Sequence, residues 1–340
     1  MMRPRASKSV PGLPRVAVLA TGGTIAGTQA PRPGRGYRSA TVSIESLIAA
    51  APGIESLARL DAAHVASIGS QDMGEAVWRA LARRTQAALD HPGVAGVVIT
   101  HGTDTMEETA YFLNLVLKSS KPVVLVGAMR PATAMSADGP MNLYNAVATA
   151  AHPDAGGRGV LVVANDDIHF AREVAKTSTT QVGTFKSTHR GLAGLVSSGR
   201  IHFYGPPVRR HTLGSDLLMP RTGALPRVDI LYAHAGMGRE LIDAAVRGGA
   251  RGVVVAGVGN GNLGSRALAA AAAASRAGLA VVRSTRTGGG IVERNIEVDD
   301  DRLGFIAADE LNPQKARILL MLGLAQTRDR AALQEMFYAY

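Results

Sequence analysis

The stretch from Val16 to Gly27 constrains the fold of this chain more than any other part of the sequence. An apolar run of strand length ends at Gly22 and Gly23 and is followed at once by Thr24. This pattern is typical of a buried parallel strand that ends at a turn facing a ligand. Because glycine lets the backbone approach a ligand closely, peptide N–H groups and the Thr24 hydroxyl can point into the same space.

Three interpretations of this stretch compete. Gly22 and Gly27 have the spacing of a phosphate-binding loop, but Thr28 stands where that loop needs its lysine. A dinucleotide-binding fingerprint is poorly matched, because its glycines are misplaced and the acidic candidate, Glu45, falls inside a helical run. A glycine turn with no catalytic role stays open on this stretch alone.

A second stretch, from Val94 to Thr109, repeats the pattern. An apolar strand ends at Gly102 and Thr103, and Asp104 follows where a helix begins. In open parallel sheets, ligands bind beyond the carboxyl ends of the strands. We therefore expect Thr24 and Thr103 to lie on the same edge of one sheet and to converge on one substrate.

The order of apolar runs predicts an α/β fold of two domains, a larger N-terminal domain with a parallel sheet and a smaller C-terminal α/β domain. We expect a basic N-terminal tail at 1–14, a catalytic domain at 15–204 with a lid loop at 28–41, a linker at 205–226 and a second domain at 227–340. In the first domain, strands are predicted at 16–20, 94–100, 121–127 and 158–164, and helices at about 43–50, 72–90, 105–119 and 139–152. In the second domain, strands are predicted at 228–233, 252–256 and 279–283, and helices at 239–247, 264–277, 313–326 and 329–338.

The helix predicted at 72–90 has Asp72 as its expected N-cap, with core residues such as Trp78 along one face. Pro313 is well placed for the first turn of a later helix. Neither Trp78 nor the apolar face needs a functional explanation.

The net charge of +10 raises the question of nucleic-acid binding. Much of the excess lies in the basic tail, up to Arg15, and in residues 200–227, while aromatic residues make up only 4% of the chain. A dedicated nucleic-acid surface is therefore not expected. The longest apolar tract, Ala267 to Ala274, is too short to span a membrane, so no membrane segment is expected. The chain has no cysteine and its nine histidines form no ligand-like pair, so we expect neither a metal nor a cofactor; His101 is interpreted as structural.

With these motifs in place, the sequence resembles the bacterial-type L-asparaginase/glutaminase family, in particular its type II branch. The resemblance covers the chain from about residue 15 to its end and is carried by seven segments: 21–27, 69–72, 101–109, 127–131, 136–140, 257–262 and 311–317. It implies the two-domain asparaginase/glutaminase fold and a homo-oligomer, a tetramer built as a dimer of dimers.

The resemblance also implies hydrolysis of L-asparagine to L-aspartate and ammonia through a β-acyl-threonine intermediate. It makes Thr24 the nucleophile, assigns Tyr37 to its activation, and makes Thr103, Lys176 and Asp104 a proton relay. It implies a set of substrate-binding residues that includes two, Asn262 and Glu297, from a neighbouring subunit: Gly23, Ser70, Gln71, Thr103, Asp104, Ala128, Asn262 and Glu297. From the residues alone, Tyr37 would be a loop tyrosine and Lys176 a surface lysine, and the sequence does not establish which threonine attacks.

Two alternatives remain. A dual-specificity glutaminase-asparaginase would use the same residues; in the family, strong glutaminases tend to carry serine where this chain has Asn262, which favours asparagine. A non-catalytic amino-acid-binding sensor is a distant alternative, since it would not need both threonines together with Lys176 and Tyr37. The basic tail is followed by no apolar segment of signal-peptide length, which predicts a cytoplasmic protein; type II relatives are often exported, so the resemblance also admits the periplasm.

Overall fold

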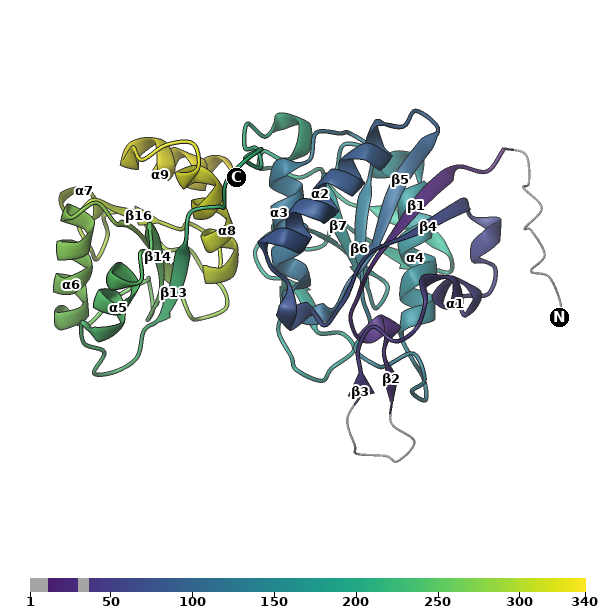
Figure 1. Cartoon of the computed structure of the whole chain (residues 1–340), viewed down its shortest axis with the longest axis horizontal. Coiled ribbons are helices and arrows are strands. Elements are labelled where there is room, and N and C mark those ends of the chain that lie inside the picture. The colour runs from purple at the N-terminus through teal and green to yellow at the C-terminus, as the bar shows by residue number, and fades with distance from the viewer. Residues whose placement is uncertain (1–11, 30–36) are drawn as a thin grey trace.

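Two α/β domains make up the computed structural model, which describes residues 12–29 and 37–340 (Figure 1). The first domain holds the N-terminal half of the chain and its larger sheet. The second domain contains the later strands and ends in two helices. The first of them, α8 (Pro313–Leu324), lies between the sheet of this domain and the first domain, and α9 (Arg330–Ala339) lies next to α8. No helix in the described part of the chain is long and apolar enough to cross a bilayer.

Within the described residues, the first domain has a sheet of eight strands in the order β12-β11-β8-β7-β6-β5-β1-β4. Five neighbouring strands are parallel: β1 (Arg15–Gly22), β4 (Arg59–Ile68), β5 (Val94–Thr100), β6 (Val123–Val126) and β7 (Val160–Ala164). The remaining three are antiparallel to their neighbours: β8 (Asp167–Phe170), β11 (Gly194–Ser197) and β12 (Arg200–Phe203). The expected parallel sheet is thus present from β7 to β4, and antiparallel strands extend it at the other edge, so that the whole sheet is mixed.

Helices cover both faces of the parallel part of the sheet. Leu19 and Ile99 pack on one face, in the same core cluster as residues of α2 (Glu75–Asp90) and α3 (Met106–Val116). Val18 and Val98 pack on the other face, with α1 (Ile44–Ala49) and α4 (Gly139–Ala151). Burial on both faces explains why β1 and β5 are continuous apolar runs in the sequence.

Two local features differ from the sequence-based expectations. Strand β4 is absent from those expectations, because it is an edge strand whose ten residues, Arg59 to Ile68, mix exposed and half-buried positions without a clean apolar alternation. Asp72 is not the N-cap of α2: the helix begins at Glu75 with Gly74 at the cap position, and Ser70–Asp72 forms a separate 3₁₀ turn, η3. The helix start expected at Pro313 is present, with the Asn312 side chain accepting a hydrogen bond from the Lys315 amide.

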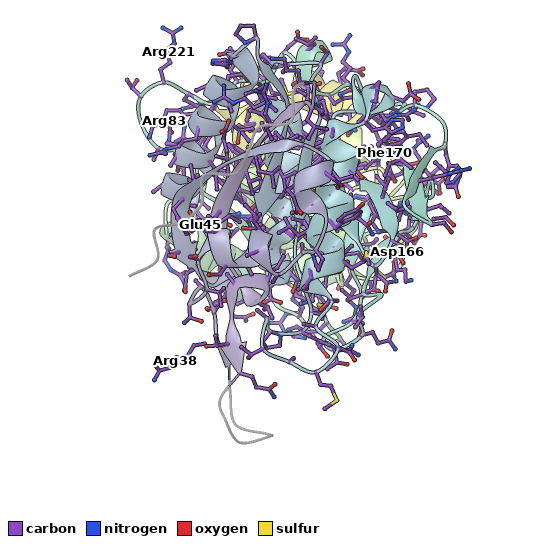
Figure 2. All side chains as sticks on the ribbon, turned by 90° about the vertical axis from the view of Figure 1, so that its right-hand side faces the viewer. Arg38, Glu45, Arg83, Asp166, Phe170 and Arg221 are labelled. Atoms are coloured by element: carbon purple, nitrogen blue, oxygen red, sulfur yellow. The ribbon has the colours of Figure 1, made fainter. Side chains whose placement is uncertain are left out.

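A connecting segment, residues 205–226, leads to the second domain and includes one short 3₁₀ turn, η6 (Thr212–Gly214). Arginines of this basic region are paired in part: Arg209 with Asp309 at 2.7 Å, and Arg210 with Asp216 at 3.1 Å. Arg221, by contrast, is exposed at the periphery of the molecule (Figure 2).

In the second domain, the described strands form a parallel sheet in the order β13-β14-β15-β16. Its elements are β13 (Val228–Tyr232), α5 (Glu240–Arg247), β14 (Gly252–Gly257), α6 (Ser265–Arg276), β15 (Ala280–Thr285), α7 (Asp300–Leu303), β16 (Phe305–Ala307), α8 (Pro313–Leu324) and α9 (Arg330–Ala339). Helices α5 and α6 cover one face of this sheet, and α8 covers the other. The cluster that holds α8 also includes α3 of the first domain, so one apolar core runs through both domains.

Two short ribbons complete the first domain. Strands β2 (Thr28–Gln29) and β3 (Tyr37–Arg38) pair antiparallel, with Gln29 opposite Tyr37, and Figure 2 shows Arg38 on the part of this ribbon that projects from the domain. Half of the predicted lid, residues 30–36, lies outside the described residues, as do residues 1–11 of the predicted tail. The second ribbon pairs β9 (Val174–Lys176) with β10 (Phe185–Ser187).

Candidate active site

Two glycine loops meet at the carboxyl edge of the first sheet. Strands β1 and β5 are neighbours, and each is followed by a 3₁₀ turn that begins with a threonine, η1 (Thr24–Ala26) and η4 (Thr103–Thr105). Gly22 and Gly23 have φ angles of +104° and +83°, which side chains rarely adopt. A Cβ atom on Gly23 would lie 2.3 Å from the Cα atom of Gly102. Only glycine lets the two backbones come this close, so the structure places Thr24 and Thr103 on adjoining loops.

The loop after β4 packs against the two threonine loops. Ser70 is 5% exposed, its hydroxyl oxygen accepts a hydrogen bond from the Asp104 amide at 3.2 Å, and its carbonyl accepts one from Thr105 Oγ1 at 2.8 Å. A Cβ atom on Gly102 would lie 2.7 Å from Ser70 Oγ. Gln71, next along this loop, is exposed, and its side chain donates to Asp72. The loops that follow β4, β1 and β5 are thus packed against one another.

Lys176 joins the two polar groups of the η4 turn. Its Nζ atom lies 2.9 Å from Thr103 Oγ1 and 2.5 Å from Asp104 Oδ1. The Lys176 side chain is 17% exposed, whereas that of Asp104 is 57% exposed. Composition alone predicts a surface lysine. In the structure, the ammonium group of Lys176 instead contacts Thr103, which is 4% exposed. Such an arrangement can move a proton between a hydroxyl group and an amine.

Buried residues fix the shape of the η4 loop. His101 is fully buried, its Nδ1 lies 2.7 Å from the Gly102 carbonyl, and burial lowers its pKa to about 4. The ring is therefore neutral near pH 7, in keeping with a structural role. Ala128, which follows β6, is 1% exposed, and the preceding Gly127 lies against Thr103, since a Cβ atom there would be 3.2 Å from Thr103 Cγ2. Across the described residues, no group of three or more His, Asp or Glu side chains is placed to hold a metal ion.

Two predicted site residues are not brought to these loops within the described chain. Asn262 and Glu297 lie in the second domain, where the Asn262 side-chain amide donates to the Glu297 carboxylate. In the part of the chain that the structure describes, neither makes a hydrogen bond to Thr103 or Asp104. The Tyr37 side chain lies outside the described residues, and only its backbone pairing with Gln29 is seen.

Sequence reasoning does not find one group beside Lys176, the carboxylate of Glu107. Glu107 is 3% exposed and accepts a hydrogen bond from the Lys176 backbone amide at 2.7 Å. It also accepts from the side chains of Asn312 and Gln314, at the start of α8. The available signal is a pair of acidic residues, Glu107 and Glu108, in the first turn of a mainly apolar helix, which does not by itself distinguish one from the other. A cavity of about 350 Å³ beside these groups is lined by Asp104, Glu107, Lys176, Thr177, Ser178, Thr179 and Gln314.

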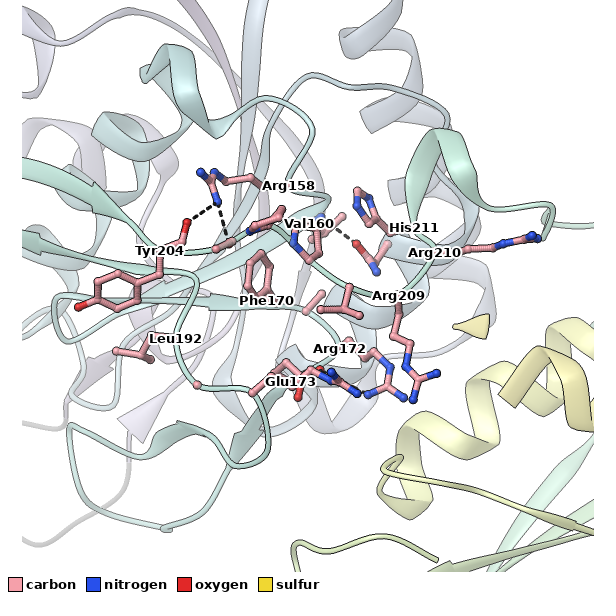
Figure 3. A pocket seen from close by; sticks show the side chains of 18 residues that line it. Arg158, Val160, Phe170, Arg172, Glu173, Leu192, Tyr204, Arg209, Arg210 and His211 are labelled. Carbon is pink, nitrogen blue, oxygen red and sulfur yellow. Dashed lines mark hydrogen bonds and ion pairs between the residues drawn. The ribbon is translucent and has the colours of Figure 1, made fainter. Parts of the chain in front are cut away.

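A separate cavity of about 390 Å³ lies beside the domain boundary and includes none of the predicted site residues (Figure 3). Its charged walls belong to an ion network across the boundary: Arg172 pairs with Glu310 at 2.8 Å, and Arg190 with Glu310 at 2.9 Å. Arg172 also donates to the Tyr340 carbonyl at 2.6 Å. These guanidinium groups hold the two domains together.

Comparison with known proteins agrees with this two-domain fold. Residues 15–209 match the family described as "Asparaginase, N-terminal", and residues 227–337 match "Glutaminase/Asparaginase C-terminal domain". The two matches define a two-domain amidohydrolase class. The chain belongs to the asparaginase/glutaminase family.

Similar proteins extend over nearly the whole chain. The chain is 47% identical over 328 residues to L-asparaginase 2 of Escherichia coli (strain K12), which covers 96% of this chain and 94% of that protein. It is also 47% identical over 329 residues to L-asparaginase 2 of Bacillus subtilis (strain 168), covering 96% of this chain and 87% of that protein. A solved structure of a probable cytoplasmic L-asparaginase from Campylobacter jejuni has a TM-score of 0.92 and 45% identity, covering 96% of this chain and all of that one. Proteins named glutaminase-asparaginase match at 40–43% identity.

Proposed function

We propose that this chain hydrolyses L-asparagine to L-aspartate and ammonia. Membership of the family and the full-length similarity to proteins named L-asparaginase support the activity. The single observation that carries the mechanism is Lys176 Nζ, which reaches both Thr103 Oγ1 and Asp104 Oδ1 beside the Thr24 loop.

The chemistry needs a nucleophile, donors for an oxyanion and a proton for the leaving group. Thr24 Oγ1 attacks the side-chain carbonyl carbon of asparagine, and the C–N bond breaks to leave a β-acyl-threonine ester. The proton that the Thr24 hydroxyl loses passes by way of Thr103 and Lys176 to the amide nitrogen, which leaves as ammonia. Water then attacks the ester, its oxygen leaves with the released aspartate, and one of its protons restores the Thr24 hydroxyl. Tyr37 is proposed to assist Thr24, and no step requires a cofactor.

Recognition of a small zwitterion requires one charge of each sign or equivalent donors. Asp104, whose carboxylate is more than half exposed, is proposed to bind the α-ammonium group of the substrate. Ser70 and Gln71 are proposed to bind its α-carboxylate. Gly23, Thr103 and Ala128 are proposed to line the space between these anchors and the reacting carbonyl.

Completion of the site requires a second subunit in this proposal. Asn262 and Glu297 hydrogen-bond to each other in the second domain, away from the loops of the first. Supplied by a neighbouring copy, they would reach the substrate ammonium group and Asp104. The proposed active unit is a homo-oligomer, a tetramer arranged as a dimer of dimers.

Selectivity for asparagine follows from fixed anchors. Glutamine is longer by one methylene, which misplaces its carbonyl relative to Thr24 when Asp104 and Ser70 hold the α-groups. A methylene changes transition-state binding by ~1–3 kcal/mol, so weak hydrolysis of glutamine is expected. The glutaminase-asparaginases among the relatives make dual specificity the second candidate.

Steady-state release of ammonia from asparagine and glutamine, measured side by side, tests the proposal. Asparagine should be hydrolysed with the larger kcat/KM. Binding of asparagine without release of ammonia would point instead to an amino-acid sensor.

A further inference from the structure

We propose that Glu107 is a positioning residue that fixes catalytic Lys176 against the second domain, so that the domain interface controls the proton relay. This inference rests on the proposed function, because it assigns Lys176 to the relay. It concerns a buried carboxylate that touches none of the groups proposed to bind substrate.

The two oxygens of Glu107 face different domains. Oε2 accepts the Lys176 backbone N–H at 2.7 Å, within the first domain. Oε1 accepts hydrogen bonds from Asn312 Nδ2, at 3.1 Å, and from Gln314 Nε2, both in the second domain. Because hydrogen bonds to a charged acceptor are about twice as strong as neutral ones, a buried carboxylate suits a junction of three donors.

The first turn of α8 also hydrogen-bonds directly to strand β9, which contains Lys176. Lys315 is 2% exposed, and its Nζ atom donates to the carbonyl groups of Arg172, at 2.7 Å, and of Val174. Strand β9 is therefore fixed by Lys315 two residues before Lys176, and at Lys176 itself through Glu107. The position of the relay amine depends on the seating of α8 against the first domain.

Asn312 can act only as a hydrogen-bond donor toward Glu107. Asn312 Oδ1 accepts the Lys315 amide at 3.1 Å as the N-cap of α8, so its Nδ2 must point to Glu107 as a donor. A glutamine side chain at position 107 offers one acceptor and one donor. If its amide nitrogen faces the Lys176 N–H, two donors meet there. If it faces Asn312 Nδ2, two donors meet on that side instead, so one hydrogen bond is lost in either orientation.

This conflict can be repaired by a second change. Asp and Asn are equally good N-caps, so Asn312→Asp keeps the bond to the Lys315 amide. In the double variant Glu107→Gln/Asn312→Asp, the introduced glutamine can accept from the Lys176 N–H and donate to the new carboxylate, and the Gln314 amide can turn to present its oxygen to the introduced nitrogen. Asn312→Asp alone places two carboxylates face to face and should disturb the strand.

The experiment is a double-mutant cycle with two readouts, asparagine turnover and hydrogen exchange at the Lys176 amide. Glu107→Gln should lower kcat by about 10- to 100-fold, the scale expected when a catalytic group is misplaced, with KM changed less than about 3-fold. Exchange at the Lys176 amide should become at least ~10-fold faster. Asn312→Asp should also lower kcat, and the double variant should return kcat to within about 3-fold of wild type.

Glu108→Gln is the matched control, since Glu108 is the adjacent acid on α3 and is not part of the junction. Its kcat and its Lys176 exchange should equal those of wild type. The inference is overturned if folded Glu107→Gln keeps wild-type kcat, or if the double variant is no better than the single ones. If Glu107→Gln does not fold, unchanged kcat and exchange in Asn312→Asp overturn it equally. A wild-type chain that releases no ammonia would refute the proposed function, while the exchange data would still decide whether Glu107 positions Lys176.

Discussion

Gly23 and Gly102 lie in backbone contact, so close that a Cβ atom on Gly23 would be 2.3 Å from the Gly102 Cα atom. The contact brings the ends of two neighbouring strands together and sets the spacing of Thr24 and Thr103. Side chains at these two glycine positions would force the Thr24 and Thr103 loops apart.

Gly23→Ala should separate the loops. The new methyl group meets backbone atoms, which cannot rotate away, and the alanine must also adopt a φ of +83°. We expect kcat/KM for asparagine to fall by at least ~10²-fold, because a shift near 1 Å is enough for such a loss. Gly74→Ala is the control: its φ is negative and its Cβ would have open space. Near-normal turnover by Gly23→Ala would show that the contact is not needed.

Removal of either site hydroxyl should abolish turnover. Thr24→Ala deletes the proposed nucleophile, and Thr103→Val deletes the hydroxyl that Lys176 reaches at 2.9 Å. Each should lower kcat by at least ~10³-fold with the fold retained. Thr28→Ala is the control, since its hydroxyl contacts only Thr41 in the exposed ribbon among the described hydrogen bonds. Substantial activity in Thr24→Ala would end its assignment as nucleophile.

Complementation between variants can test the shared site. Thr24→Ala damages the first domain and Glu297→Ala the second, so each homo-oligomer should be inactive. After dissociation and random reassembly, a mixed dimer has one intact site, and total activity should recover to about a quarter of wild type. Absence of recovery in demonstrably mixed oligomers, or a fully active monomer in sedimentation, would contradict a site completed by a partner.

Substitution of Asn262 should change selectivity. In this chain its side-chain amide donates to Glu297, a bond that the shorter serine side chain does not reproduce. Wild type should prefer asparagine over glutamine by at least ~10-fold in kcat/KM, and Asn262→Ser should reduce that ratio. Comparable values for both amides in wild type would refute the selectivity, and an unchanged ratio in the variant would exclude Asn262 as its cause.

Glu108 should make stability depend on pH. Burial raises the pKa of its carboxyl group from 4.5 to about 7, a shift that Arg317 opposes. Between those values the unfolded chain loses its proton first, so the folded state binds more protons and the free energy of unfolding falls as pH rises. Glu108→Gln stays neutral and should be more stable than wild type above pH 7, by about 1–2 kcal/mol because the group is partly exposed. Urea unfolding of wild type and Glu108→Gln at pH 4.5 and pH 8 measures the difference in their free energies of unfolding, which should be near zero at pH 4.5. If the two proteins were equally stable at pH 8 as well, the raised pKa of Glu108 would be contradicted.

Much of the first domain can be predicted because its central strands are buried on both faces. Strands β1 and β5 are apolar runs that end at glycines, a signal contained within a few residues. Strand β4 carries no such signal, since an edge strand with Asp61 and His64 exposed lacks a continuous apolar pattern. Its 3₁₀ continuation through Ser70 is visible in the sequence only as a motif.

The polar part of the site depends on contacts between distant residues. Lys176 lies 73 residues from Thr103 in the chain, and no local pattern distinguishes it from a solvated lysine. Only the resemblance to the family assigns it a role, and the structure supplies the two distances. Glu107 escapes prediction for the same reason, because its partners in α8 follow more than 200 residues later.

That separation has a consequence for synthesis of the protein. Glu107 and Asn312 are 205 residues apart, so the first domain leaves the ribosome with both threonine loops made but without the donors that complete the Glu107 junction. A nascent chain paused before α8 would present Thr24, Thr103 and Lys176 with strand β9 held from one side only. Folding of the first domain alone is then not enough for efficient hydrolysis, because α8 must be made and seated before assembled subunits can complete the site.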